Sequence, residues 1–311
     1  FDLAASRMLG ACDVVNGWSS ASLITLRAAR RNGLPAVLQT GSAHIETQAE
    51  LLAQERRRLG LPVTVTHPAV IRRAVAEYAE ADLIVVPSRF ALGTFVERGV
   101  PASKLAVVHE TAVARAAPPA ERPRRARPRI LFVGQLDVRK GISYLFDAFR
   151  SLGGRATLRL VGPVDRRLLA RLAPLPEGVE VAGPRSGELL AAEFRDADVF
   201  VLPSVEDGFG LAAVEAMAAG LPAVVSSHAG CADLIDDGRN GFVVAARDAR
   251  ALADRLDVLV RDARLRARMG EEARRTASAR TWEVYGSEMA RAYQGLDVTR
   301  ATRMASYVRA G

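Results

Sequence analysis

Residues 198–227 have the sequence DVFVLPSVEDGFGLAAVEAMAAGLPAVVSS, and this stretch decides the fold. Apolar runs of strand length lie at 198–202 and 222–226, and the segment 210–219 between them has the length and composition of a helix. Short apolar strands that alternate with helices form βα units, which build parallel sheets. The stretch therefore predicts an α/β protein.

The same alternation continues along the chain and predicts two doubly wound, Rossmann-like units. In the second half, further strands are expected at 129–133, 157–161, 179–182 and 241–244, with helices at 141–151, 165–173, 187–195 and 248–261 and a helical tail over about 264–295. In the first half, we expect strands at 12–15, 35–39, 82–87 and 104–108, and helices at 19–31, 44–59, 67–80 and 89–98.

The segment ARAAPPAERPRRARP, 114–128, predicts a linker between these units, because it contains four prolines and five arginines without an apolar period. The predicted organisation is a first domain over 1–113, a second domain over 129–280 and a C-terminal helix over 281–311 that returns towards the first domain. The first half is shorter than the second, so we expect its sheet to lack the opening βα units, as in a truncated chain.

The composition is that of a globular protein, with 49% hydrophobic and 25% charged residues. Two cysteines without CxxC or Cys/His clustering argue against a disulfide framework and a zinc site, so we expect a reducing, cytoplasmic setting. The net charge of +8 leaves two interpretations open, an anionic partner or a basic solvated surface. With only 5% aromatic residues, nucleic acid is disfavoured as that partner.

The loop VGQLDVRKGISYL, 133–145, predicts a phosphate site at the carboxyl end of a strand. Arg139 and Lys140 stand just before a helix, where cations are unfavourable unless an anion binds with them. Only two lysines occur in the chain, Lys104 and Lys140. An exposed basic loop without a ligand is the alternative interpretation.

The helix at 210–219 is apolar on all sides except for Glu215, and a lone buried carboxylate is costly. Two interpretations stand open: Glu215 pairs with an arginine, or it faces a polar cavity and accepts vicinal hydroxyls. His228, in the small-residue loop 226–235, is a weaker candidate for ligand contact. The sequence contains no GxxxxGK[ST] motif and no GxGxxG motif after the first strand of either half, which disfavours P-loop enzymes and nicotinamide dehydrogenases.

The chain resembles the retaining glycosyltransferases of family 4, also called group 1, which have the GT-B fold. The similarity is carried by five stretches in the family's order, namely 77–108, VGQLDVRKGISYLFDAF, ADVFVLPSVEDGFGLAAVEAMAAGLPAVVSS, GCADLIDDGRNGFVV and TWEVYGSEMARAY. The resemblance implies two Rossmann-like domains facing across a cleft, the first binding the acceptor and the second the donor.

The resemblance also implies roles for individual residues. The family's acid-x7-Glu signature falls on Asp207 and Glu215, whereas Glu206 stands one residue too early. Asp207 would contact the donor sugar, Glu215 the ribose hydroxyls, and Lys140 the diphosphate. Further donor contacts are implied for Gly134, Gly208, Phe209, Gly210 and Leu211, and Arg139 would replace the second family cation, whose position Gln135 occupies. His44 would act close to the donor and the acceptor.

The sequence thus predicts a retaining, metal-independent glycosyltransferase that needs no cofactor and uses a nucleotide-sugar donor. The acceptor, whether a saccharide, a lipid or a small molecule, stays open, as does peripheral association with a membrane. Two alternatives remain: a nucleotide-sugar binding module without turnover because of the truncation, and another GT-B enzyme such as an epimerase or a phosphorylase.

Overall fold

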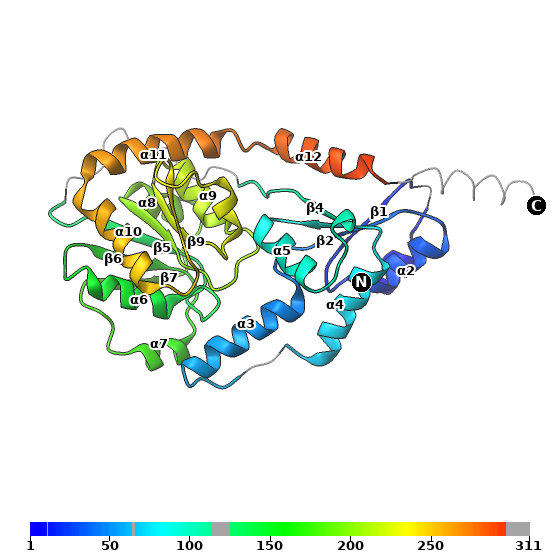
Figure 1. Cartoon of the computed structure of the whole chain (residues 1–311), viewed down its shortest axis with the longest axis horizontal. Helices are drawn as coiled ribbons and strands as arrows, with labels where there is room; N and C mark the ends of the chain where they lie inside the picture. The colour runs from blue at the N-terminus through cyan, green and yellow to red at the C-terminus, as the bar shows by residue number, and fades with distance from the viewer. Residues whose placement is uncertain (11, 64–65, 113–124, 297–311) are drawn as a thin grey trace, which may run out of the picture. The chain divides into compact units, whose positions relative to one another are not determined.

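The computed structural model describes residues 1–10, 12–63, 66–112 and 125–296 (Figure 1). The chain divides into two compact units. The first unit comprises Phe1–Glu50, Thr64–His109 and Tyr285–Gly311, and the second comprises Leu51–Val63 and Glu110–Val284. None of the described helices combines the length and the apolar character needed to span a membrane.

The second unit is a parallel sheet in the order β10-β9-β8-β5-β6-β7. Its strands are β5 (Arg129–Val133), β6 (Thr157–Val161), β7 (Val179–Gly183), β8 (Val199–Leu202), β9 (Ala223–Ser226) and β10 (Gly241–Val244). Its helices are α6 (Ile142–Ser151), α7 (Arg166–Leu172), α8 (Gly187–Arg195), α9 (Leu211–Ala218), α10 (Ala249–Arg261) and α11 (Ala263–Ser278), with the 3-10 turn η2 (Gly230–Leu234).

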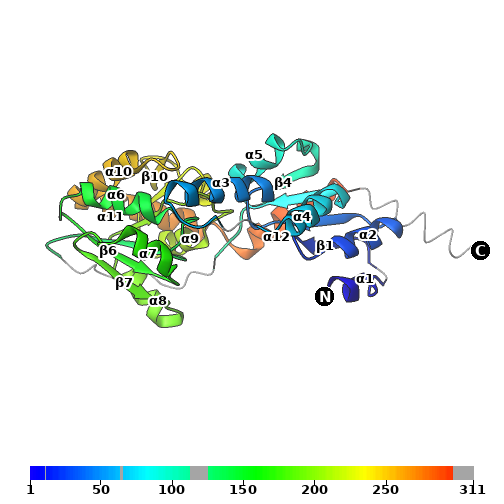
Figure 2. The ribbon, with the colours of Figure 1, turned by 90° about the horizontal axis from the view of Figure 1, so that it is seen from below.

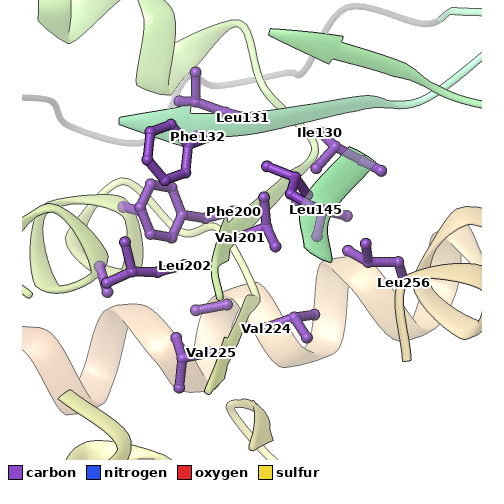
Figure 3. Packing of buried hydrophobic residues seen from close by; sticks show 14 of the residues in the cluster. Ile130, Leu131, Phe132, Leu145, Phe200, Val201, Leu202, Val224, Val225 and Leu256 are labelled. Atoms are coloured by element: carbon purple, nitrogen blue, oxygen red, sulfur yellow. The ribbon is translucent and has the colours of Figure 1, made fainter. Parts of the chain in front are cut away.

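The core of this unit lies between the central strands and the helices that cover them. Phe132 on β5, Phe200 on β8 and Val224 on β9 are fully buried, with Leu145 on α6 and Leu256 on α10 (Figure 3). Central parallel strands are covered on both faces, so they read as continuous apolar runs. This explains why the strands expected in this half agree closely with those observed.

The first unit contains a parallel sheet in the order β1-β2-β3-β4. The strands are β1 (Val15–Trp18), β2 (Ala36–Gln39), β3 (Leu83–Val86) and β4 (Leu105–Val107). The helices are α1 (Asp2–Ser6), α2 (Leu23–Arg31), α4 (Pro68–Glu80), α5 (Arg89–Glu97) and the start of α3 (Ile45–Arg58), with the 3-10 turn η1 (Ala102–Lys104). In Figure 2, α1 lies beside α2, where the Asp2 carboxylate accepts hydrogen bonds from Ile24 N and Thr25 N at 2.8 Å.

The last helix, α12 (Trp282–Gln294), packs against the first sheet. Its Met289 is buried with Val37 and Val85, and the Tyr285 hydroxyl lies 3.4 Å from Gln39 Oε1. The C-terminal end of the described chain is therefore part of the first unit.

The C-terminal half of α3 belongs to the second unit, where the buried Glu55 anchors it. Glu55 accepts hydrogen bonds from the Tyr144 hydroxyl at 3.0 and 3.1 Å and from Arg58 Nε at 3.0 Å. Arg247, which has a left-handed backbone with φ of 68°, pairs with the same carboxylate at 3.0 Å. Burial, together with the Glu55 charge, raises the pKa of Tyr144 to about 12, so its hydroxyl stays a donor. The anchor therefore fixes part of α3 to the first turn of α6.

Two sequence expectations are wrong in detail. The strand expected at 12–15 forms at Val15–Trp18, because its pairing with β2 sets the register. The helical tail expected over about 264–295 is two helices, and the Thr281 hydroxyl accepts a hydrogen bond from Val284 N at 3.3 Å near the start of the second. Most of the predicted linker 114–128 lies outside the described residues, and the predicted domain limits stay predictions.

Candidate functional site

The order of the second sheet creates a switch point between β5 and β8. The chain moves from β5 outwards to β6 and β7, then returns to β8 on the other side of β5. Because parallel crossovers are right-handed, α6 and α9 lie on opposite faces of the sheet, and the loops before them diverge. Such a point at the carboxyl ends of the strands is where open α/β sheets bind ligands.

The two loops at this point are joined through their backbones. The carbonyl oxygen of Arg139 accepts hydrogen bonds from Val205 N at 2.8 Å and Glu206 N at 3.3 Å. Gly141 has a φ of 69°, and a Cβ there would lie 2.0 Å from the Pro203 carbonyl oxygen. A side chain at this position would force the loops apart, which explains the glycine.

Two ion pairs cross between the same loops. Arg139 Nε lies 2.6 Å from the fully buried Glu206 carboxylate, and the Lys140 ammonium pairs with Asp207. The Ser204 hydroxyl donates to Asp207 Oδ2 at 3.4 Å. The structure thus brings together Arg139, Lys140 and Asp207, which the sequence singled out. Glu206, which lies one residue before the acid of the signature, is the partner of Arg139.

Gly134 leads out of β5 beside the Lys140 side chain. Its N–H donates to the Val161 carbonyl at 2.9 Å, and a Cβ built on it would lie 3.8 Å from Lys140 Cε. Asp137 accepts a hydrogen bond from Lys140 N at 3.0 Å. Burial raises the pKa of Asp137, although Lys140 and Arg139 act against this. Gly134 and Asp137 of this loop therefore both lie next to Lys140.

The start of α9 closes the site from the other loop. Gly208 and Phe209 are buried, Gly210 caps the helix with a φ of 90°, and Leu211 is the first helical residue. A Cβ on Gly210 would lie 2.7 Å from Leu202 Cδ2 and 3.5 Å from Asp207 Oδ2. The N-terminus of a helix carries a partial positive charge and N–H groups that point outwards, so it attracts anions.

Glu215 lies in the second turn of α9 and is 9% exposed. Its neighbours Val214 and Ala216 are also buried. The side chain is therefore as enclosed as the sequence indicated, and its role stays a prediction.

A third loop, after β9, is hydrogen-bonded to the backbone of Asp207. Asp207 N donates to the His228 carbonyl at 3.0 Å, and Gly230 N donates to the Asp207 carbonyl at 3.0 Å. The His228 ring places Nδ1 2.9 Å from the Val205 carbonyl, so the tautomer protonated there fastens the two loops together. Cys231 behind them is buried, and that burial raises the pKa of its thiol. His228 thus has a structural contact in addition to its place at the site.

Glu110 is a further carboxylate of this region, and the sequence did not indicate it. Burial raises its pKa, and the negative charge of Asp207 adds to this effect. Its place three residues after β4, in VVHET, was the available sequence signal.

His44 belongs to the first unit, where it stands just before α3. Its ring lies 4.9 Å from Tyr78 and 5.0 Å from Phe95 between ring centroids, and the residue is 3% exposed. His44 N donates to Thr94 Oγ1 at 2.9 Å, and Nδ1 accepts from Glu46 N at 3.3 Å. Burial lowers the pKa of His44; Glu46 opposes this and Arg98 reinforces it. The imidazole is therefore held in its neutral form.

The sequence profile of the glycosyl transferases group 1 matches residues 115–276, just over half of the chain. The chain belongs to this family.

Two curated relatives show how far the similarity extends. The D-inositol 3-phosphate glycosyltransferase of Streptomyces avermitilis is 35% identical over 156 residues, which are 50% of this chain and 34% of that protein. The phosphatidyl-myo-inositol mannosyltransferase of Mycobacterium leprae is 34% identical over 171 residues, which are 53% of this chain and 46% of that protein. The matches thus cover between a third and a half of each relative's length.

Solved structures confirm the predicted fold. The sucrose-phosphate synthase of Thermosynechococcus elongatus aligns with a TM-score of 0.72 at 22% identity, over 94% of this chain and 75% of that one. Anabaena HepE in complex with UDP and glucose aligns with a TM-score of 0.67 at 18% identity, over 99% and 81%. The chain therefore has the α/β GT-B fold with two Rossmann-like domains.

Proposed function

We propose that this chain is a retaining, metal-independent glycosyltransferase that transfers a sugar from a nucleotide-sugar donor to an acceptor hydroxyl. The observation that carries the proposal is the meeting of the Lys140 ammonium, the Asp207 carboxylate and the start of α9 at the β5/β8 switch point. A nucleotide-sugar has an anionic diphosphate next to a hydroxylated sugar, so it needs a cation and hydrogen-bond acceptors side by side.

In this proposal, Lys140 binds the diphosphate together with the N–H groups at the start of α9. Gly208, Phe209, Gly210 and Leu211 supply the backbone there, and Gly134 leaves room beside the lysine. When the glycosidic bond breaks, negative charge develops on the leaving nucleoside diphosphate. A fixed ammonium and a helix N-terminus stabilise that charge without reorganising, which is the role that a metal ion would otherwise fill.

Asp207 contacts the hydroxyls of the donor sugar. An ammonium has three N–H donors, so Lys140 can hold a phosphate oxygen and Asp207 together. The Ser204 contact and the two backbone bonds through the loop after β9 fix the carboxylate in place. The ion pair thus places the residue that binds the sugar, Asp207, next to the residue that binds the diphosphate, Lys140.

Glu215 accepts the two ribose hydroxyls, since each oxygen of an ionised carboxylate can accept one O–H. Arg139 acts indirectly: its pairing with Glu206 holds the two loops at the distance that the donor needs. His44, held neutral in the first unit, acts on the acceptor side.

We also propose peripheral association with anionic membranes, supported by the net charge of +8. Sedimentation with vesicles of phosphatidylglycerol and phosphatidylcholine tests it. Binding that rises with the anionic fraction supports the proposal, and equal binding to neutral vesicles contradicts it.

The transfer itself is tested by incubating the purified chain with UDP-, GDP-, ADP- and TDP-sugars. The acceptors are myo-inositol, inositol phosphate and simple methyl glycosides. We expect a product of one added sugar whose anomeric configuration, read by NMR, equals that of the donor, and we expect EDTA to leave the rate unchanged. An inverted product, or an epimerised donor in the absence of an acceptor, would contradict the proposal.

A further inference from the structure

We propose a second binding site, a carbohydrate platform for the acceptor built on Trp18 at the carboxyl end of β1; this inference rests on the proposed function. Trp18 ends the strand and is 53% exposed. About half of the indole is therefore not covered by packing, and the carboxyl ends of parallel strands are where open α/β sheets bind ligands.

The backbone of Trp18 is fixed by a buried serine. The Ser22 hydroxyl accepts a hydrogen bond from Trp18 N and donates one to the Trp18 carbonyl, both at 2.9 Å. Ser22 is only 5% exposed, so the serine side of these bonds is buried. The indole is therefore carried on a rigid turn and not on a loose loop.

The turn after Trp18 is strained, and a buried acid holds the strain. Ser20 has a φ of 73°, a left-handed conformation that is unfavourable for residues other than glycine. The fully buried Glu77 accepts hydrogen bonds from Ser20 N at 2.5 Å and from Ser22 N at 2.9 Å. Backbone strain that the surroundings maintain in this way is concentrated at functional sites.

One side of the indole rests on the next loop. A Cβ built on Gly41, two residues after β2, would lie 3.2 Å from Trp18 Cζ2. A glycine at this position lets the ring lie close to the backbone. The rest of the ring stays open to a ligand, as its exposed fraction shows.

The same turn is connected to His44 through one buried tyrosine. The Tyr78 hydroxyl is hydrogen-bonded to the Ser19 side chain and to the backbone of Ile45. The Tyr78 ring also packs against the His44 ring, with 4.9 Å between centroids. The Trp18 turn and the His44 turn therefore form one connected structure at the same edge of the first sheet.

This combination of groups fits a sugar ring. A pyranose has a face of C–H bonds that packs on an aromatic ring and a rim of hydroxyls that needs polar partners. Trp18 offers the aromatic surface, and the half-buried Ser42 in the neighbouring loop carries a hydroxyl that donates to the Ala43 carbonyl at 3.2 Å and can still accept a hydrogen bond. A nucleobase could also stack on an indole, so the test must separate the two.

The chain contains only two tryptophans, Trp18 and Trp282, so Trp282→Phe leaves Trp18 as the single indole emitter. This variant is titrated separately with methyl β-D-galactopyranoside, methyl α-D-mannopyranoside and UDP. We expect at least one glycoside to change the emission in a saturable way and to protect the indole from acrylamide, and UDP to do neither. An equal response to UDP would assign Trp18 to nucleotide binding, and no response to either glycoside up to its solubility limit would also overturn the proposal.

The second measurement is the steady-state kinetics of the variants, made with an acceptor that the wild-type chain glycosylates. Trp18→Ala should raise the acceptor KM about tenfold, the size of one aromatic contact, and leave the donor KM and kcat unchanged. Trp18→Phe should restore most of the affinity, and Trp282→Ala, which removes the other exposed tryptophan, should change nothing. A rise in the donor KM, or an equal effect of Trp282→Ala, would overturn the assignment. If no donor is turned over, the proposed function fails while the fluorescence titration still decides on the Trp18 site.

Discussion

The Lys140 ammonium and the Asp207 carboxylate form an ion pair between the loops that follow β5 and β8. These strands are neighbours in the sheet but are separated in the chain by two βα units. The pair thus marks the place where two distant segments meet, and the donor site is proposed around it. The two side chains are only 15% and 9% exposed, so the pair is largely shielded from water.

Replacing Lys140 with alanine should weaken the binding of UDP or GDP at least tenfold. The variant removes a charge-assisted hydrogen bond to phosphate, worth about 1.5–3 kcal/mol, and tenfold corresponds to about 1.4 kcal/mol. Isothermal titration calorimetry measures the affinity. Lys104→Ala is the matched control, because it removes the other lysine of the chain, which lies in the first unit and donates to the Ala79 carbonyl at 2.9 Å. Equal losses in both variants would contradict the role of Lys140.

Arg139→Ala should destabilise the protein by about 3 kcal/mol. It leaves the carboxylate of Glu206 buried without the guanidinium that compensates it, and breaking a buried pair costs about 3–5 kcal/mol. Urea denaturation gives the free energy of unfolding. Arg274→Ala, which breaks an exposed pair with Glu271 on α11, should leave the midpoint unchanged. If Arg139→Ala is as stable as the wild type but no longer binds nucleotide, then Arg139 contacts the ligand and its pair with Glu206 does not stabilise the two loops.

Glu55 and Tyr144 should show an energetic coupling in a double-mutant cycle. Their hydrogen bonds hold the end of α3 to the first turn of α6. Glu55→Ala, Tyr144→Phe and the double variant should yield a coupling free energy on the order of 1 kcal/mol. The exposed pair of Arg150 and Asp147 on α6 provides the comparison, and no measurable coupling is expected there. Additive effects of the Glu55 and Tyr144 changes would show that the contact does not stabilise the fold.

The stability of the protein should fall on mild acidification in a way that depends on His44. Burial lowers the pKa of its imidazole from the ordinary 6.5, so the unfolded chain binds a proton more readily than the folded protein. The stabilisation is therefore complete above pH 6.5 and is lost as the pH falls through the lowered pKa, with a slope of at most about 1.4 kcal/mol per pH unit. Urea midpoints measured between about pH 5 and pH 8 provide the test.

His44→Gln should reduce this pH dependence, whatever it does to stability at neutral pH. His67→Gln, at an exposed position that caps α4, serves as the control for exchanging a histidine for glutamine. An unchanged slope in His44→Gln would mean that the imidazole is not held neutral by burial.

Much of the second unit could be predicted from the sequence, because its strands are buried on both faces. The run RILFV was expected at 129–133 and forms β5 at those residues, and GFVV was likewise expected and forms β10. In β1, by contrast, VNGW contains a polar residue and a glycine, so local pattern did not reveal that pairing with β2 would make it a strand. Here tertiary contacts override propensity.

In the site, too, features with a local sequence signal could be predicted, and features that depend on tertiary contacts could not. Asp207, Lys140 and the Gly-Phe-Gly turn could be found, because loops at strand ends carry their signal in a few consecutive residues. The pairing of Arg139 with Glu206, the support from the loop after β9 and the proximity of Glu110 could not be found, because each joins segments far apart in the chain. The sequence also does not reveal that α3 is divided between the two units, because the helix itself is continuous.

The most direct test of the donor site is a crystal structure of the full chain with a bound nucleotide-sugar, UDP-glucose being the first to try. We predict a diphosphate oxygen at about 2.7–3.0 Å from Lys140 Nζ, with the diphosphate at the start of α9, the sugar hydroxyls on Asp207 and the ribose on Glu215. A nucleotide bound away from the β5/β8 switch point, or bound there with its diphosphate out of reach of Lys140, would contradict it.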